Sequence, residues 1–119
     1  MVRIFSDNPS LEGRALQIYQ ILICKAHNRQ LTTYGEIAHL IGYGGSGVLD
    51  RQLGIIMTYS DRNGLPPLTI LVVNDETGSP GTGLTTFEDE NADRRKVFKF
   101  SWYDLIPPTI EELAKYREV

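Results

Sequence analysis

The sequence predicts a small α/β domain in which helices predominate, and three observations support that prediction. Apolar residues recur at helical spacing in three segments before residue 61. A run of branched apolar residues over 65–74 is typical of a strand, and turn residues follow it. Two more amphipathic segments follow residue 86. Three helices and then a β-hairpin is the order of a winged helix-turn-helix domain, here with a C-terminal helical extension.

The domain organisation follows from the length of the chain. With 119 residues it can build one compact domain with a real core, but not two. We therefore assign 1–86 to the winged-helix domain. We assign 87–119 to a helical C-terminal extension that packs on the same domain.

The first helix is expected to begin after Asn8 or Ser10, since either side chain can act as an N-cap. Cys24 lies near its apolar stripe and is expected to be a small buried side chain rather than a reactive thiol. The stripe repeats at three- and four-residue steps and comprises Leu11, Ala15, Ile18, Tyr19, Leu22 and Ala26.

The second helix has a clear start signal in LTTYGEIAHLIG, residues 31–42. Thr33 is followed three residues later by Glu36, which is the pattern of a capping box. We expect a short helix over about 34–41, ended by Gly42.

The third helix is expected over about 48–60, after a glycine-rich turn with the sequence GYGGSG at 42–47. That turn has no following Lys-Ser or Lys-Thr pair and no preceding strand, so it is not read as a nucleotide-phosphate loop. Its backbone N–H groups could still approach a phosphate. The buried face of the third helix is expected to comprise Leu49, Leu53, Ile56 and Met57.

The remaining elements are a strand, a wing and two helices. The strand over 65–74 has no polar face, so both of its sides should be covered. A tight turn at 75–78 and a loop or short returning segment, SPGTGL at 79–84, would complete the hairpin or wing. A helix is expected within 87–102, and Pro108 suits the first turn of a last helix.

Composition narrows the class of protein. Hydrophobic residues make up 41% and charged residues 23%, and no apolar run approaches the roughly 20 residues of a membrane span. The N-terminus has no apolar signal region, and the single cysteine and two histidines do not suit a disulfide or a zinc cluster. We expect a cytoplasmic protein with no membrane partner, no metal and no cofactor.

Charge is distributed unevenly along the chain. The formal net charge is −3, which does not favour nucleic-acid binding through bulk charge. Residues 1–65 have a net charge of +1, whereas residues 66–119 have a net charge of −4. The N-terminal part could therefore face phosphate, while the C-terminal part would be repelled by it.

Three stretches of the chain carry a resemblance. They are TTYGEIAHLIG, RQLG at 51–54, and NGLPPLTILVVNDETGSPG. Together they resemble the DNA-binding domain of the O6-alkylguanine-DNA alkyltransferases and the alkyltransferase-like proteins, over about residues 11–83. That family has a TYGEIA-type helix start, an RAVG helix, an asparagine–proline turn and a strand with a Pro-Cys-His-Arg catalytic motif.

The resemblance implies roles for four residues. Tyr34 matches a tyrosine that presses on a DNA phosphate and helps to rotate a nucleotide outward. Arg51 matches an arginine that enters the minor groove and fills the space of the flipped base. Gly54 matches the glycine that follows this arginine. Asn63 matches an asparagine that holds the turn behind the recognition helix to the active-site strand.

The sequence departs from the family at the catalytic motif. With Pro66 aligned on the family's proline, Leu71 stands where the nucleophilic cysteine should be. Val72 and Val73 replace the histidine and the arginine, and Cys24 lies on the first helix. Without a thiol and a base to deprotonate it, alkyl transfer has no chemistry available. The chain is therefore not expected to be an enzyme, and an enzyme with a new site has the least support.

The candidate DNA-binding residues also have plainer structural interpretations. Tyr34 could instead pack over the first helix, and Arg51 could pair with Asp50 or Glu36 on the surface. The basic cluster of Arg94, Arg95, Lys96 and Lys99 fits intrahelical pairing as well as phosphate contact. The acidic pairs and triplets at 75–76 and 88–90 are expected to be solvated. The residues expected to contact DNA are Thr33, Tyr34, Gly44, Gly45, Ser46, Arg51, Gln52 and Arg62.

Two functions from different classes follow. The favoured one is a non-enzymatic protein that binds double-stranded DNA, with recognition of modified or damaged DNA implied by the resemblance alone. The alternative is a protein-interaction module that kept the scaffold and lost DNA binding. A protein partner, or self-association through the C-terminal extension, remains open.

Overall fold

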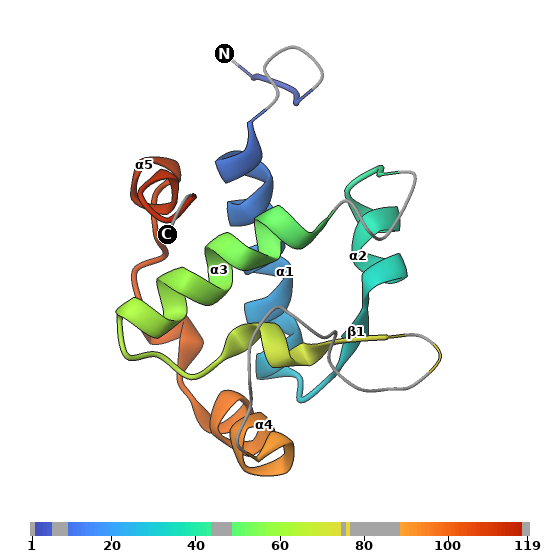
Figure 1. The fold of residues 1–119 in the computed structure, drawn as a ribbon, viewed down its shortest axis with the longest axis vertical. Helices are drawn as coiled ribbons and strands as arrows, with labels where there is room; N and C mark the ends of the chain where they lie inside the picture. The colour runs from blue at the N-terminus through green and yellow to red at the C-terminus, as the bar shows by residue number, and fades with distance from the viewer. Residues whose placement is uncertain (1, 6–9, 44–48, 75, 77–88, 118–119) are drawn as a thin grey trace.

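A computed structural model describes residues 2–5, 10–43, 49–74, 76 and 89–117. Helices dominate, and a two-stranded sheet accompanies them (Figure 1), which confirms the expected mainly helical α/β character. The elements, with η denoting a 3-10 helix, are α1 (Leu11–His27), β1 (Thr32–Thr33), α2 (Tyr34–Leu40), α3 (Asp50–Arg62), η2 (Leu68–Leu71), β2 (Val72–Val73), α4 (Glu90–Lys99), η3 (Trp102–Asp104) and α5 (Ile110–Ala114).

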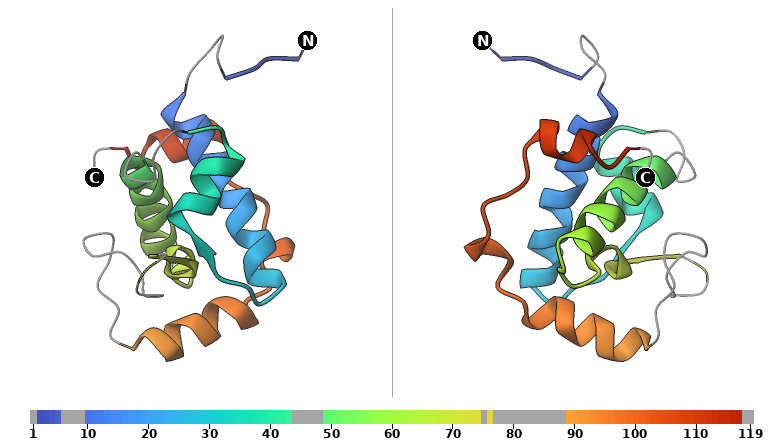
Figure 2. Two further views of the ribbon diagram at one scale, coloured as in Figure 1. Left: turned by 90° about the vertical axis from the view of Figure 1, so that its right-hand side faces the viewer. Right: turned by 60° about the vertical axis from the view of Figure 1, so that its left-hand side comes forward.

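Helix α1 is the centre of the fold. It contacts α3, η2, α4, η3 and α5, and the two views in Figure 2 show these elements arranged around it. Ser10 is the N-cap, and its Oγ accepts a hydrogen bond of 2.9 Å from the N–H of Gly13. The predicted stripe is buried at Ala15, Ile18, Tyr19, Leu22 and Ala26, and Leu11 packs against it.

Cys24 is the exception on α1, because its side chain is exposed. The expectation of a buried cysteine is therefore wrong. At 100° per residue, Cys24 lies about 160° around the helix from both Leu22 and Ala26, which are buried. The amide Nδ2 of Asn28 lies 3.5 Å from its sulfur.

Helix α3 packs against α1 and crosses it obliquely (Figure 1). It begins at Asp50 and ends at Arg62, two residues later at each end than predicted. Met57 was expected on the buried face but is partly exposed, whereas Ile55 is buried. The face that packs on the core comprises Leu53, Ile55, Ile56 and Tyr59, preceded by the buried Leu49.

The expected strand over 65–74 is wrong for most of its length. Residues 68–71 form a 3-10 helix, and only Val72–Val73 is a strand. This strand pairs in parallel with β1, with Thr32 opposite Val72 and Thr33 opposite Val73. Residues 68–73 are all buried, as predicted, because an apolar run reports burial rather than backbone conformation. The expected returning segment at 79–84 lies outside the described residues, so the expected hairpin is not described.

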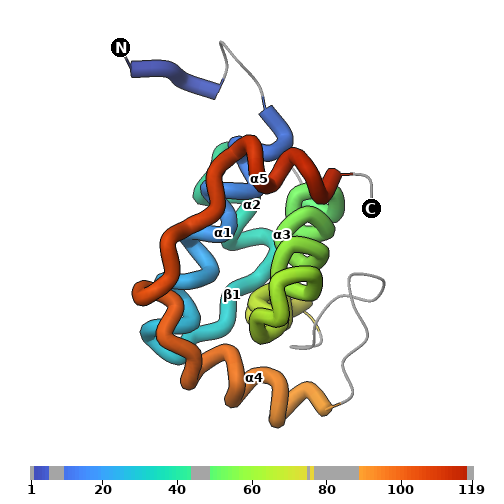
Figure 3. The backbone as a smooth tube through the Cα atoms, turned by 90° about the vertical axis from the view of Figure 1, so that its left-hand side faces the viewer, coloured from blue at the N-terminus to red at the C-terminus, as the bar shows by residue number. Residues whose placement is uncertain are grey.

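The C-terminal extension closes the same core. Helix α4 lies within the predicted 87–102, and Trp102 is buried with its Nε1–H donating to the carbonyl oxygen of Val97 at 2.8 Å. Helix α5 contacts α1 and α3, and Figure 3 shows it crossing the end of the molecule opposite to α4. Its N-cap is Thr109, in a complete capping box with Glu112. Pro108 thus precedes the cap and is not in the first helical turn.

Candidate nucleic-acid interface

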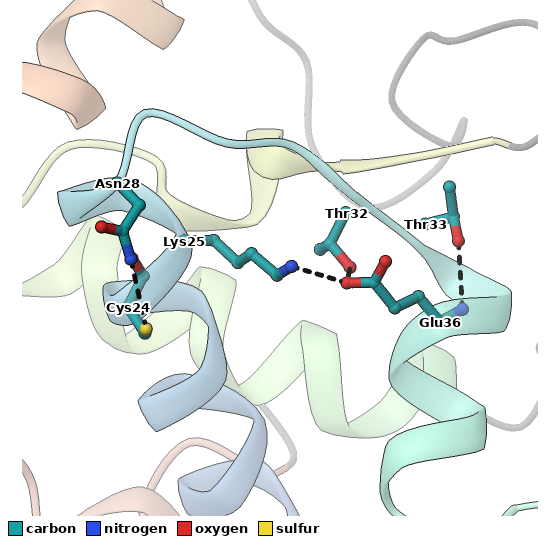
Figure 4. A network of polar contacts seen from close by, with 6 residues as sticks. All are labelled: Cys24, Lys25, Asn28, Thr32, Thr33 and Glu36. Carbon is teal, nitrogen blue, oxygen red and sulfur yellow. Dashed lines mark hydrogen bonds and ion pairs between the residues drawn. The ribbon is translucent and has the colours of Figure 1, made fainter.

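The start of α2 is held by a polar cluster (Figure 4). Thr33 is the N-cap, and its Oγ1 accepts a hydrogen bond of 3.0 Å from the N–H of Glu36. The carboxylate of Glu36 does not return to the backbone of Thr33, as a capping box requires. Its Oε1 accepts a hydrogen bond of 2.9 Å from the hydroxyl of Thr32 and lies 2.7 Å from Nζ of Lys25. The predicted capping box is therefore half formed.

This cluster joins two helices. Lys25 belongs to the last turn of α1, Thr32 is a buried residue of β1, and Glu36 lies in the first turn of α2. Hydrogen bonds from Lys25 and Thr32 hold the pKa of the Glu36 carboxyl below its ordinary value. The charge of Glu36 beside Tyr34 is thus balanced by a cation. Sequence analysis missed Lys25, because its partner is eleven residues away across a turn.

Tyr34 is the first residue of α2. Its side chain is partly exposed and packs against the hydrophobic core. Part of this side chain therefore helps to seat α2 on the core. The remaining part stays at the surface beside Thr33, which is also partly exposed.

The solvent-facing side of α3 presents two arginines. Arg51 and Arg62 are both exposed. Eleven residues at 100° each bring Arg62 to within about 20° of Arg51 around the axis, and about 16 Å along it. The small residues Gly54 and Thr58 lie between them. Among the described residues, Arg51 has no ion pair with Asp50, and Glu36 is paired with Lys25 instead.

Acidic residues offset this pair of arginines. Asp50 and Asp61 are exposed next to Arg51 and Arg62, so the solvent-facing side of α3 carries no net charge. Attraction of a phosphate chain by this face alone would therefore be weak. Any contact made by Arg51 depends on its reach and geometry more than on the local field.

Gln52 does not belong to the surface. It is only 4% exposed, and its Nε2 donates a hydrogen bond of 3.2 Å to the hydroxyl of Tyr43. The expected contact of Gln52 with DNA is therefore wrong for this conformation, since the amide instead fastens the turn between α2 and α3. Gly44, Gly45 and Ser46 lie outside the described residues.

Asn63 has a structural role, but a different one from that implied by the resemblance. It is the C-cap of α3, and its Nδ2 donates to the carbonyl oxygen of Tyr59 at 2.8 Å and to the hydroxyl of Tyr116 at 3.3 Å. The amide thus holds the turn to α3 itself and to the segment after α5. The following Gly64 has a φ of +67°, which glycine adopts without strain.

Leu71, which the resemblance aligns with the family's nucleophilic cysteine, is part of the core. Leu71 is 0% exposed in η2, and Val72 and Val73 are buried after it. Cys24 is exposed on the far side of α1 and cannot substitute for a thiol there. Within the described part of the chain, no group of three or more His, Cys, Asp or Glu side chains could hold a metal ion.

Comparisons with known proteins complete the description of the site. No protein-family model matches the chain, and comparisons with curated proteins and with solved structures found no significant match. None of the helices in the described ranges has the length and apolar character needed to cross a membrane.

Proposed function

We propose that the protein is a non-enzymatic protein that binds double-stranded DNA through α2, α3 and the turn between them. In this proposal α2 and α3 are the two helices of a helix-turn-helix unit. The observation that carries the proposal is the state of Arg51. The side chain of Arg51 is exposed at the start of α3. Among the described residues, it forms neither an ion pair nor a hydrogen bond.

The environment of Arg51 supports the same interpretation. Tyr34 begins α2 and keeps part of its surface exposed, as a residue that presses on a phosphate must. The partly buried hydrogen bond from Gln52 to Tyr43 fastens the start of α3 to the segment that follows α2, so Arg51 is presented from a fixed helix. The resemblance of TTYGEIAHLIG and RQLG to the alkyltransferase DNA-binding domain points in the same direction.

The proposal is limited to binding. Leu71, Val72 and Val73 are packed apolar side chains, so no thiol or base lines the element where the family places its chemistry. Recognition of modified or damaged bases is the finer form of the proposal. It rests on the likeness of Tyr34 and Arg51 to the nucleotide-rotating pair.

A protein-interaction module is the second candidate. The observation that favours it is the balance of charge on α3, where Asp50 and Asp61 accompany the two arginines. Such a mixed surface suits a protein partner with complementary charges better than it suits a phosphate chain.

Fluorescence anisotropy with a labelled duplex of about 20 base pairs separates the two candidates. If the protein binds DNA, its affinity for the duplex should fall steeply as the salt concentration rises, because phosphate contacts release counterions. Arg51→Ala should weaken binding at least about tenfold at fixed low salt, a loss of about 1.4 kcal/mol. Lys115→Ala, which removes an exposed cation at the end of α5, is the matched control.

A further inference from the structure

Two cations of helix α4 lie opposite its buried residue. Arg95 and Lys99 lie two residues before and two residues after Val97, which is fully buried. At 100° per residue, both therefore point about 160° away from Val97, on the side that faces solvent, and both are exposed. Asp93 lies four residues before Val97, so it belongs to the packed side, and its side chain is only 19% exposed.

Pairing within the helix does not use up these cations. The ion pair that α4 shows among the described residues joins Lys96 to Asp93 at 3.8 Å, with the Lys96 side chain 69% exposed. Neither Arg95 nor Lys99 has an ion pair within the described ranges. Among the described residues, the alternative in which nearby acids neutralise this basic cluster is thus met weakly by Lys96 and not by Arg94, Arg95 or Lys99.

The helix dipole explains only part of this arrangement. It accounts for acidic residues at the start of α4, where Asp89 is the N-cap, and for basic residues in the last turn. It does not explain why Arg95 and Lys99 share the solvent-facing side. Like charges four residues apart oppose helix formation, and a bound anion relieves that repulsion.

Neighbouring elements extend the positive surface. Helix α4 contacts α1, and Figure 3 shows it at the end of the molecule where α1 finishes. Arg29 is exposed in the turn that follows α1. The acid of the adjoining 3-10 helix is Asp104, which is exposed. We define the basic face of α4 as Arg95, Lys96 and Lys99, which are all exposed. The exposed acids Asp89 and Glu90 lie at the other end of this helix, at its N-terminus.

We propose that the basic face of α4 is a second contact with duplex DNA, made to the sugar-phosphate backbone. This inference rests on the proposed function for its ligand, but it adds an element that the resemblance does not include. Phosphate contacts of this kind supply affinity and orientation and carry no sequence information. The acidic C-terminal part of the chain is then not uniformly repelled by DNA, because in α4 Arg95 and Lys99 face solvent while Asp93 lies toward the packed side.

Paired substitutions of equal charge test the proposal. Arg95→Gln with Lys99→Gln removes two cations from the face while keeping good helix formers. Arg3→Gln with Lys115→Gln removes two exposed cations from the segment before α1 and from the end of α5. Duplex binding by the full chain is followed by anisotropy between about 25 and 200 mM salt.

The α4 pair should weaken binding at least about fivefold at the lowest salt and lower the slope of log K against log salt by about 2. The control pair should leave the affinity at the lowest salt and the slope within about a factor of two of the wild-type values. Equal effects of the two pairs would overturn the proposal. The proposal would also be overturned if the α4 pair lost binding to vesicles that contain anionic lipid while its binding to DNA stayed unchanged.

The outcome also separates this inference from the proposed function. If Arg51→Ala weakens binding and the α4 pair does not, the second contact is wrong and the first stands. If the wild-type chain does not bind DNA at low salt, the proposed function fails. Lysine acetylation of the wild-type chain gives a readout without substitution. Duplex should protect Lys96 and Lys99 and leave Lys115 reactive, and equal acetylation with and without DNA would also overturn the proposal.

Discussion

The bond network of Glu36 gives the most detailed prediction about stability. Lys25→Met removes a cation whose Nζ lies 2.7 Å from the carboxylate, in a pair with side chains 23% and 44% exposed. A partly exposed pair of this geometry contributes about 0.5 to 1 kcal/mol to the free energy of unfolding. Thr32→Val removes a hydrogen bond from a buried hydroxyl to a charged acceptor and should lower that free energy by about 1.5 kcal/mol.

A double-mutant cycle isolates the pair. Lys25→Met and Glu36→Gln should each destabilise, and the double variant should be less destabilised than their sum by about 0.5 to 1 kcal/mol. Urea unfolding can be followed by the fluorescence of Trp102, the single tryptophan, which is buried. Lys115→Met is the control and should stay within about 0.5 kcal/mol of the wild type.

The pH dependence of the cycle has a definite sign. The pKa of Glu36 is lowered in the folded state from an ordinary value of 4.5, so its contribution is complete above that value. The contribution is lost as the pH falls through the folded-state pKa, because the protonated carboxyl no longer attracts Lys25. Single-variant effects that add within about 0.3 kcal/mol at pH 7 would refute the reasoning, as would a coupling that persists at pH 2.

Three further predictions concern the core and the surface. Leu71→Ala should destabilise by about 3 kcal/mol and Leu71→Met by less than about 1.5 kcal/mol in urea unfolding, because the site is fully buried; a loss below 1 kcal/mol would contradict this. Burial raises the pKa of Tyr19 to about 12. Its contribution to stability is therefore complete below pH 10 and is lost as the pH rises toward 12, so Tyr19→Phe should flatten the alkaline decline, and parallel curves would contradict this. Cys24 should react with a thiol reagent in the native protein, because its side chain is exposed; reaction only after unfolding would show that it is covered.

Helix positions could be predicted from the sequence because their signals are local. The stripe of α1 and the cap at Thr33 each involve residues three or four apart, and the structure confirms them. Helical spacing also predicts that Cys24 is exposed, since it lies two residues from the buried Leu22 and Ala26, and residues two apart on a helix lie on nearly opposite sides. That error came from weighing the residue type above the helical geometry.

Tertiary pairing could not be predicted in this way. The partner of Val72 is Thr32, forty residues earlier, and nothing in the apolar run over 65–74 specifies a parallel neighbour or a 3-10 helix. Glu36 fits a capping box locally, but Lys25 and Thr32 compete for its carboxylate once α1 and α2 meet. Likewise Gln52 looks like a surface residue until Tyr43 is placed above it.

The central claim is that Arg51 is a DNA contact presented by α3. The most direct measurement is the dissociation constant of a 20-base-pair duplex at about 50 mM salt, for the wild type, Arg51→Ala and the control Lys115→Ala. We predict that Arg51→Ala raises the dissociation constant at least about tenfold and that the control changes it by less than about twofold. An unchanged dissociation constant for Arg51→Ala, or a wild-type chain that does not bind at low salt, would contradict it.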